Sequence, residues 1–575
     1  MLLIGSFLAL TGRCFYLQYF KGEYYLDMSM KQQRAYINQQ PQRGVILDRR
    51  GRVLAASNQV QTIFAEPRVI KDPKTISTEL ASVVDMGAHE ICRLILESGN
   101  PGYARIKKVT DANQCSAARN IRGIGVQSEW QRHYPMGHLV SNIVGFTSLD
   151  NHGLEGIELK YDKQLSGSAA RNIFFADVNR RPIRLKQQSG DLADGVGIIL
   201  TIDATIQQFA REELIKQCEN YEAESGVAIV AEPKTGAILA MVSLPDFDPE
   251  TRLSSSTVMS REPEDGLDEA LPKSDIKIFD PNTFRSRVIT DWYEPGSIIK
   301  PIVVAIALDA GVVNKTEQIF CENGNYRGKG FGRISEYRMG FGNLTVREIL
   351  VKSSNIGMAK IGQRLGKERL YNGLKLFGFG RKVGIDLPGE VEGLLRPPNQ
   401  WTGYSVTRIP FGQEICVTAI QLVRAFCILA NGGRLVRPFI VRAIVDNNGE
   451  ITTLKRLPPP VGYIISPEVA EWVVTEAMAG VVNEGTGNRA QLDNWQVFGK
   501  TGTANIARSD TRGYSDSEYV ASFVAGAPAE DPAVIVLVSI RKPNRKLGKG
   551  YTGGVVASPV AANIIKKTLT YLGVE

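Results

Sequence analysis

The arrangement of strand-like segments most limits the folds open to this chain. Residues 226–243 contain two apolar runs joined by Pro233-Lys234-Thr235-Gly236, which predicts a β-hairpin. Three further strand-like runs lie near the other end, at residues 496–504, 519–527 and 533–540, before a predicted helix at residues 558–572. Helices are also predicted at residues 203–218, 301–308, 345–365 and 418–430. Helices mixed with short, consecutively connected strands favour an antiparallel sheet flanked by helices, so we predict an α+β domain.

The chain of 575 residues is long enough for two or three domains. A polar linker at about residues 166–196 precedes the α+β region, which we therefore place at residues 197–575. Residues 21–196 would form a separate N-terminal module. Within that module, residues 43–55 alternate like strands around Asp48-Arg49-Arg50-Gly51, which predicts a second hairpin.

Residues 1–20 are apolar apart from Arg13 and a few small polar side chains. The segment has three interpretations: an uncleaved signal-anchor, a cleaved signal peptide, or an ordinary buried helix. We favour a single-pass membrane anchor at residues 1–20, although its apolar part is shorter than the roughly 20 residues that cross a bilayer. The side chains that follow suit the aromatic belt at a membrane surface: Tyr16, Tyr19, Lys21, Tyr24 and Tyr25.

Composition excludes some classes of function. A net charge of +8 fits an anionic membrane or cell wall better than nucleic acid, and we find no basic stripe with interleaved aromatic residues. The seven cysteines are scattered without a C-x-x-C pair, so we expect no metal and no cofactor. The four histidines all lie within the first 152 residues, so the predicted α+β domain has no imidazole.

A serine and a lysine occur together in the segment DWYEPGSIIKP, residues 291–301. Ser297 follows Pro295-Gly296, and Lys300 lies three residues further on, at the start of a predicted buried helix. Residues three apart are neighbours on a helix surface, and the N–H groups of a first turn can donate to an anion. One turn could thus supply a nucleophile, a base and half of an oxyanion hole. Ser-x-x-Lys alone is common by chance, so this inference needs further motifs.

Two further polar clusters follow in the chain: Ser353-Ser354-Asn355, which we expect early in a helix, and Lys500-Thr501-Gly502-Thr503, which we expect in a strand. The order Ser-x-x-Lys, Ser-x-Asn, Lys-Thr-Gly is the signature of penicillin-recognising serine enzymes. A second Lys-Thr-Gly, at Lys234, lies in the turn of a hairpin upstream of Ser297, where we interpret it as an ordinary turn.

The residue types explain how such a site would work. A serine hydroxyl needs a neighbouring base, and without histidine that base would be Lys300, kept partly neutral by burial and by the charge of Lys500. Ser353 could relay a proton to the leaving amine, and Asn355 could bind both Lys300 and the substrate amide.

On that strand, Gly502 would let substrate backbone lie close, and Lys500, Thr501 and Thr503 would hold a terminal carboxylate. The oxyanion hole would combine the N–H of Ser297 with the N–H of Thr503.

With these motifs the chain resembles the class B penicillin-binding proteins, the peptidoglycan D,D-transpeptidases, over nearly its whole length. Within that family it is most similar to the septal, division-type (FtsI-like) members. The supporting segments outside the three motifs are residues 43–55, 132–135, 153–158, 485–487, 552–554 and 558–559. One segment departs from the family, because Pro410-Phe411-Gly412-Gln413 replaces an expected glycine-aromatic-glycine pattern beside the site.

The resemblance implies a fold, a reaction and a location. The domain at residues 197–575 would have the penicillin-binding, serine β-lactamase-like fold, and residues 21–196 would be an elongated pedestal or dimerisation-type module. Ser297 would attack the D-Ala-D-Ala bond of a stem peptide, and an amine from another stem would resolve the acyl-enzyme into a cross-link. β-Lactam antibiotics would acylate Ser297, and the catalytic domain would lie on the outer side of the cytoplasmic membrane.

The same resemblance implies a SEDS-type membrane glycosyltransferase and other division proteins as partners, contacted through the anchor and pedestal. Alternatives from the sequence are an elongation-type transpeptidase, a D,D-carboxypeptidase, a β-lactamase, and a division scaffold without activity. The N-terminal module argues against a β-lactamase, and the intact motif residues argue against a scaffold.

Overall fold

The computed structural model describes residues 2–39, 41–109, 111–148, 150–168, 170–176, 182–189, 192–250, 283–337, 340–446, 448–454, 462–508 and 513–575. The chain divides into two compact units. Unit 1 contains Met1–Gly44, Ser57–Arg132 and Lys163–Val196, and unit 2 contains Val45–Ala56, His133–Asp162 and Gly197–Glu575.

Unit 1 contains two groups of strands. In the first, β1 (Arg34–Gln39), β6 (Ala170–Ala176) and β7 (Pro182–Ser189) form an antiparallel sheet in the order β1-β6-β7. In the second, the later residues of β3 (Val53–Ala65) pair with β4 (Ala104–Val109), and β5 (Ile124–His133) also pairs with β3. The second group packs with the helices α3 (Pro73–Val84), α4 (Ala88–Leu96) and α5 (Ala112–Arg119) around a core that includes Ile63, Leu80, Ile91 and Cys115.

The first segment of unit 1 is helical. It comprises α1 (Leu2–Phe15), a π-helical stretch (Tyr16–Phe20) and α2 (Gly22–Gln33). Over the residues whose placement the structure gives, no helix reaches the length and apolar character needed to cross a bilayer.

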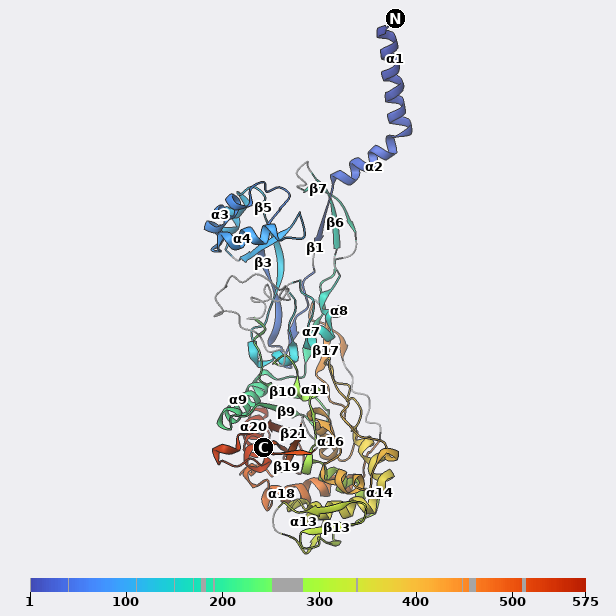
Figure 1. The fold of residues 1–575 in the computed structure, drawn as a ribbon, viewed down its shortest axis with the longest axis vertical. Coiled ribbons are helices and arrows are strands. Elements are labelled where there is room, and N and C mark those ends of the chain that lie inside the picture. Colours follow the sequence, from blue (N-terminus) through green and yellow to red (C-terminus); the bar gives the residue numbers. More distant parts are fainter. Residues whose placement is uncertain are drawn as a thin grey trace. The chain divides into compact units, whose positions relative to one another are not determined.

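Unit 2 is organised around the antiparallel sheet predicted from the strand-like segments (Figure 1). Its order is β10-β9-β21-β20-β19, so the N-terminal hairpin lies beside the three C-terminal strands, and β19 is the last strand. The bounds are β9 (Ser225–Ala231), β10 (Ile238–Leu244), β19 (Phe498–Ala507), β20 (Tyr514–Ala527) and β21 (Val534–Arg541). Both faces of this sheet are covered, since β9 and β10 are buried at every residue.

Two helices cover one face of the sheet. α9 (Ala204–Asn220) begins after Asp203, whose carboxylate accepts a hydrogen bond from the Thr205 N–H at 3.0 Å. α20 (Ser558–Leu572) closes the chain, and both helices share a core cluster with alternate strand residues such as Val230 and Val538. α16 (Ala419–Ala430) contacts β9 and β21 but lies outside that cluster, so it covers the opposite face.

The remaining elements of unit 2 frame the sheet and the motif residues. The predicted hairpin at residues 43–55 is confirmed, because β2 (Ile46–Leu47) pairs antiparallel with the start of β3. The other strands of unit 2 are β8 (Gly197–Leu200), β11 (Trp292–Tyr293), β12 (Gln318–Phe320), β13 (Asn325–Gly328), β14 (Gly332–Ser335), β15 (Asn343–Thr345), β16 (Val417–Thr418), β17 (Val441–Val445) and β18 (Ile451–Leu454). The helices that matter for the site are α11 (Arg287–Thr290), α12 (Lys300–Asp309), α13 (Val346–Val351) and α14 (Asn355–Phe377).

The single helix predicted at residues 345–365 is wrong. The chain forms two helices there, α13 and α14, separated by Lys352-Ser353-Ser354. Ser353 has φ +57°, a left-handed conformation that a continuous right-handed helix cannot contain. Ser354 then caps α14, with its hydroxyl accepting a hydrogen bond from the Gly357 N–H at 3.0 Å. The helix is therefore interrupted at Ser353-Ser354, because Ser353 has a left-handed backbone and Ser354 caps the next helix.

Candidate active site

Ser297 lies on a tight turn that leads directly into α12. Gly296–Ile299 form a 3-10 helix, and the Lys300 N–H donates a hydrogen bond to the Ser297 carbonyl oxygen. The sequence predicted an α-helical first turn, but the tighter 3-10 form places side chains three apart directly above one another. Ser297 and Lys300 therefore lie on the same side of the turn. Ser297 is half-buried and Lys300 is completely buried.

The buried Lys300 ammonium reaches the Ser-x-Asn segment between α13 and α14. Its Nζ donates to the Ser353 carbonyl oxygen at 2.7 Å, to Asn355 Oδ1 at 2.8 Å and to Ser353 Oγ at 3.2 Å. These three acceptors match the three N–H donors of a lysine side chain. The left-handed conformation of Ser353 allows its carbonyl and its hydroxyl to face the same lysine.

Lys500 reaches the same serine from strand β19. Its Nζ donates to Ser353 Oγ at 3.0 Å and to the Thr501 carbonyl oxygen at 3.2 Å, and the side chain is fully buried. One hydroxyl, that of Ser353, thus lies between two lysine nitrogens. The structure brings together all three motifs predicted from the sequence.

Burial dominates the electrostatics of this pair. Burial lowers the pKa of Lys300 from its ordinary value near 10.5 to about 7, and the carboxylate of Glu336 partly opposes that change. Burial, and then the charge on Lys300, lower the pKa of Lys500. The sequence argument named burial and the charge of Lys500 as the two causes that would lower the pKa of Lys300; in the structure burial is the main cause, and the neighbouring charge that acts on this pKa is that of Glu336. A lysine that is neutral near pH 7 can accept a proton from a hydroxyl group.

Strand β19 packs closely on the Ser297 turn. A Cβ atom on Gly502 would lie 2.7 Å from Ile298 Cγ1 and 3.0 Å from the Pro295 carbonyl oxygen. Glycine at this position lets the strand approach the turn, whereas the sequence argument assigned that space to substrate. On the other side of the contact, a Cβ atom on Gly296 would lie 3.3 Å from the Thr503 carbonyl oxygen.

The hydroxyl groups of the strand have partners in neighbouring loops. Thr501 Oγ1 lies 2.6 Å from Thr486 Oγ1, and Thr503 Oγ1 accepts a hydrogen bond from the Gly553 N–H at 3.1 Å. Residues 485–487 and 552–554, singled out in the sequence, therefore flank β19 and hold its threonines. Lys500, Thr501, Gly502 and Thr503 all lie within one short stretch beside the Ser297 turn.

Two regions of the chain match known protein families. Residues 226–566 match the penicillin binding protein transpeptidase domain, and residues 38–198 match the penicillin-binding protein dimerisation domain. The chain belongs to the penicillin-binding protein transpeptidase family. The resemblance to class B penicillin-binding proteins drawn from its motifs is confirmed.

This penicillin-binding protein is also similar in sequence and structure to individual members of the family. Stage V sporulation protein D of Bacillus subtilis is 32% identical over 581 residues, covering 99% of this chain and 84% of that protein. Peptidoglycan D,D-transpeptidase FtsI of Escherichia coli is 28% identical over 542 residues, covering 93% of this chain and 84% of that protein. The crystal structure of a peptidoglycan synthetase from Bifidobacterium adolescentis shares the fold, with a TM-score of 0.72, 23% identity, and coverage of 94% and 97% of the two chains.

One residue at the site of this penicillin-binding protein was missed in the sequence. Glu336 follows β14 and accepts a hydrogen bond from Ser354 Oγ at 2.6 Å and another from the Asn355 N–H at 2.8 Å. No motif marks this glutamate, because its partners lie 18 and 19 residues further along the chain. Only the fold of the β13–β14 hairpin places its carboxylate at the start of α14.

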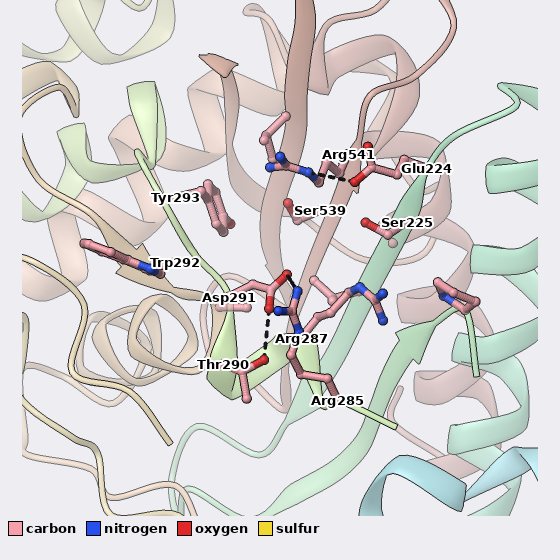
Figure 2. A pocket seen from close by; sticks show the side chains of 15 residues that line it. Glu224, Ser225, Arg285, Arg287, Thr290, Asp291, Trp292, Tyr293, Ser539 and Arg541 are labelled. Atoms are coloured by element: carbon pink, nitrogen blue, oxygen red, sulfur yellow. Dashed lines mark hydrogen bonds and ion pairs between the residues drawn. The ribbon is translucent and has the colours of Figure 1, made fainter. Parts of the chain in front are cut away.

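A separate cavity of the penicillin-binding protein, of about 550 Å³, lies beside β9, β21 and β11 (Figure 2). None of the predicted site residues lines it. Two ion pairs form part of its wall, one between Arg541 and Glu224 at 3.1 Å and one between Arg285 and Asp291 at 3.0 Å. The cavity is thus distinct from the lysine and serine cluster, although β11 leads along the chain into the Ser297 turn.

We expect Gly412→Ala to damage the site of this penicillin-binding protein. Gly412, in the segment that departs from the family pattern, has φ +88°, and an added Cβ would lie 2.1 Å from the Gly296 carbonyl oxygen. The Gly296 N–H also donates to the Gly412 carbonyl oxygen at 3.2 Å, so the clash falls on the residue before Ser297. We expect a loss of about 2–4 kcal/mol in the free energy of unfolding, measured by chemical denaturation, and slower penicillin acylation.

A matched control separates backbone strain from the clash. Gly449 has φ +83°, and an added Cβ would have no atom within 4 Å. Gly449→Ala should therefore cost only about 1–2 kcal/mol, from the left-handed backbone alone, and leave acylation unchanged. Equal effects of the two substitutions on acylation would contradict the role of Gly412 in seating the Ser297 turn.

Proposed function

We propose that this penicillin-binding protein is a peptidoglycan D,D-transpeptidase that acts through an acyl-enzyme on Ser297. The observation that carries the proposal is the position of Ser353 Oγ between Lys300 Nζ, at 3.2 Å, and Lys500 Nζ, at 3.0 Å, beside the Ser297 turn. This arrangement offers a base for a nucleophilic serine and a route for its proton to a leaving amine.

In the first half of the reaction, neutral Lys300 accepts the proton of the Ser297 hydroxyl as Ser297 Oγ attacks the carbonyl carbon of the D-Ala-D-Ala bond. The backbone N–H groups of Ser297 and Thr503 stabilise the oxyanion. The carbon–nitrogen bond then breaks, and the proton passes by way of Ser353 to the amine of the departing D-alanine. The donor peptide remains as an ester on Ser297.

In the second half, an amine of a second stem peptide attacks the ester and loses a proton to Lys300. A new amide bond forms, Ser297 leaves as a hydroxyl, and the cross-link is complete. Before this step, during acylation, Asn355 orients the donor amide, and Lys500, Thr501 and Thr503 hold the terminal carboxylate that leaves with the D-alanine. β-Lactam antibiotics enter the same path because their carboxylate and amide resemble those of the donor end. They leave an ester on Ser297 that is hydrolysed slowly.

We place the reaction at the division septum, with the elongating side wall as the alternative. We also propose that α1 anchors the chain in the cytoplasmic membrane, with the catalytic domain outside. Its apolar side chains support an anchor because they are exposed, Leu3 to 87% and Phe7 to 75%. A SEDS-type glycosyltransferase and division proteins would contact the anchor and the N-terminal module. A fluorescent fusion confined to the side wall in dividing cells would count against the septal role.

The decisive experiment uses the full chain in detergent micelles with a pentapeptide donor, an amine acceptor and, in parallel, a fluorescent penicillin. A transpeptidase releases D-alanine, forms the cross-linked dimer, and keeps the penicillin label for hours. D-Alanine without dimer indicates a carboxypeptidase, and label lost as penicillin is consumed indicates a β-lactamase. Neither label nor D-alanine would indicate a scaffold and refute the proposal.

Lys234, in the second Lys-Thr-Gly of the chain, provides a control for Lys500. We expect Lys500→Ala to slow penicillin acylation about 10- to 100-fold, because it removes two hydrogen bonds at the site, one of them to Ser353 Oγ. Lys234→Ala should leave the rate unchanged, because Lys234 lies on the exposed β9–β10 turn and pairs with Asp531 at 2.6 Å. The rates are read from the time course of fluorescent label. A comparable loss in Lys234→Ala would contradict the assignment of the motif to β19.

A further inference from the structure

Glu336 occupies the start of α14, where backbone N–H groups lack partners inside the helix. Its Oε2 accepts from the Asn355 N–H at 2.8 Å, and its Oε1 accepts from the Ile356 N–H at 3.2 Å and from Ser354 Oγ at 2.6 Å. One carboxylate therefore satisfies two N–H groups of the first turn and fixes the hydroxyl that caps it.

The same segment fixes the side chain of Asn355. Asn355 Nδ2 donates to the Ser335 carbonyl oxygen at 3.2 Å, and Asn355 Oδ1 accepts from Lys300 Nζ at 2.8 Å. The first contact selects the amide orientation, because only the NH₂ group can donate to a carbonyl, and the oxygen must then face Lys300. Ser335 and Glu336 thus hold both the backbone and the side chain of the residue that contacts Lys300.

We propose that Glu336 is a positioning residue for acylation: it holds Asn355, and through Asn355 the Lys300 amine, in the geometry that activates Ser297. The proposal rests on the proposed transpeptidase function, which supplies the role of Lys300. Glu336 itself contacts neither Lys300 nor Ser297 in the described contacts, so it acts through its neighbours.

The site requires a carboxylate rather than its amide. Both oxygens of Glu336 accept hydrogen bonds from N–H or O–H donors, and glutamine would turn an NH₂ group toward one of these donors. The negative charge has a second effect, because it favours the protonated form of Lys300 and so raises its pKa against the effect of burial. Besides Glu336, the groups that face Lys300 are Lys500, whose own pKa is lowered by burial and by the charge on Lys300, and the neutral Ser353 and Asn355.

The test compares fluorescent-penicillin acylation of the full chain carrying Glu336→Ala with that of Glu348→Ala. Glu348 is a matched control, because its carboxylate caps α13 by accepting from the Thr345 N–H at 2.9 Å. Both variants lose a helix cap and should lose similar thermal stability. Only Glu336→Ala should acylate more slowly, by about 10- to 100-fold, since two N–H donors and one hydroxyl lose their acceptor.

Two further variants, Glu336→Asp and Glu336→Gln, test quantities that would not change if Glu336 only stabilised the fold. Glu336→Asp should recover part of the rate because it keeps the carboxylate. Glu336→Gln should shift the acid limb of the acylation-rate profile to lower pH, because loss of the carboxylate lowers the pKa of Lys300 and leaves it neutral at lower pH. Glu336→Gln also keeps the test decisive if Glu336→Ala fails to fold.

The possible outcomes separate this inference from the function it rests on. Wild-type protein that takes no label at Ser297 would refute the proposed function itself. Wild-type labelling with an unchanged rate in Glu336→Ala, an unmoved acid limb in Glu336→Gln, or an equal loss of rate in Glu348→Ala would each overturn only the role of Glu336.

Discussion

Replacing Ser297 with alanine is expected to abolish the covalent penicillin adduct and to lower transpeptidation on the order of 10⁶-fold. The effect is this large because the attacking oxygen is removed and the nearby residues cannot take its place. Lys300 and Lys500 are both buried and directed to Ser353, so neither amine is free to act as the nucleophile. The measurement is fluorescent labelling followed by peptide mapping of the labelled residue.

An exposed serine serves as the control. Ser82 lies on α3 of unit 1 and is exposed, with its hydroxyl donating to the Glu79 carbonyl oxygen at 2.7 Å. Ser82→Ala should label like the wild-type protein, and both variants should keep the wild-type circular dichroism spectrum. Label of equal intensity on Ser297→Ala, or an adduct mapped to another serine, would show that Ser297 is not the nucleophile.

The second large effect concerns Lys300 and pH. In wild-type protein the acylation rate is expected to rise as the pH increases through about 7, because Lys300 then changes from the protonated form to the neutral form that can accept a proton. Lys300→Met should lower the rate by about 10²–10⁴ and remove this acid limb. The second-order rate constant for penicillin acylation, measured from pH 5 to pH 9, tests both statements.

Methionine is chosen because it fills the same buried space without a charge. It leaves the Ser353 carbonyl oxygen and Asn355 Oδ1 without their lysine donor, so some loss of stability is expected as well. Thermal unfolding of the variant separates that loss from catalysis. A wild-type rate that does not change across pH 7, or a variant with an unchanged rate, would exclude Lys300 as the base.

Much of the site could be predicted because its parts are short and local. The order of the three motifs, the β9–β10 hairpin and the closing helix α20 all follow from runs of a few residues. Ser297 and Lys300 had to be neighbours in any helical turn, whichever form the turn took. The meeting of the three motifs also required that β19 and the segment between α13 and α14 both lie near the start of α12.

Other features could not be predicted, because they depend on contacts between distant segments. Ser353 is left-handed because its carbonyl and hydroxyl both serve Lys300, which lies 53 residues earlier in the chain. The contact of Glu336 with the start of α14 could not be predicted, because only the β13–β14 hairpin places its carboxylate there. Gly502 was assigned to substrate because a glycine in a strand suggests a close approach, but the sequence does not name the approaching group.

Strand β19 lies at the end of the five-stranded sheet of unit 2. In the part of the chain that the structure describes, β19 pairs with β20 on one side and with no strand on the other. A strand edge open to an incoming peptide is equally open to the edge of a second molecule. The first half of β19 is buried and packs on the Ser297 turn, whereas Asn505 and Ala507 at its other end are exposed. We therefore expect self-association through the exposed end of β19 at high concentration, and a β-lactam bound beside β19 should suppress aggregation.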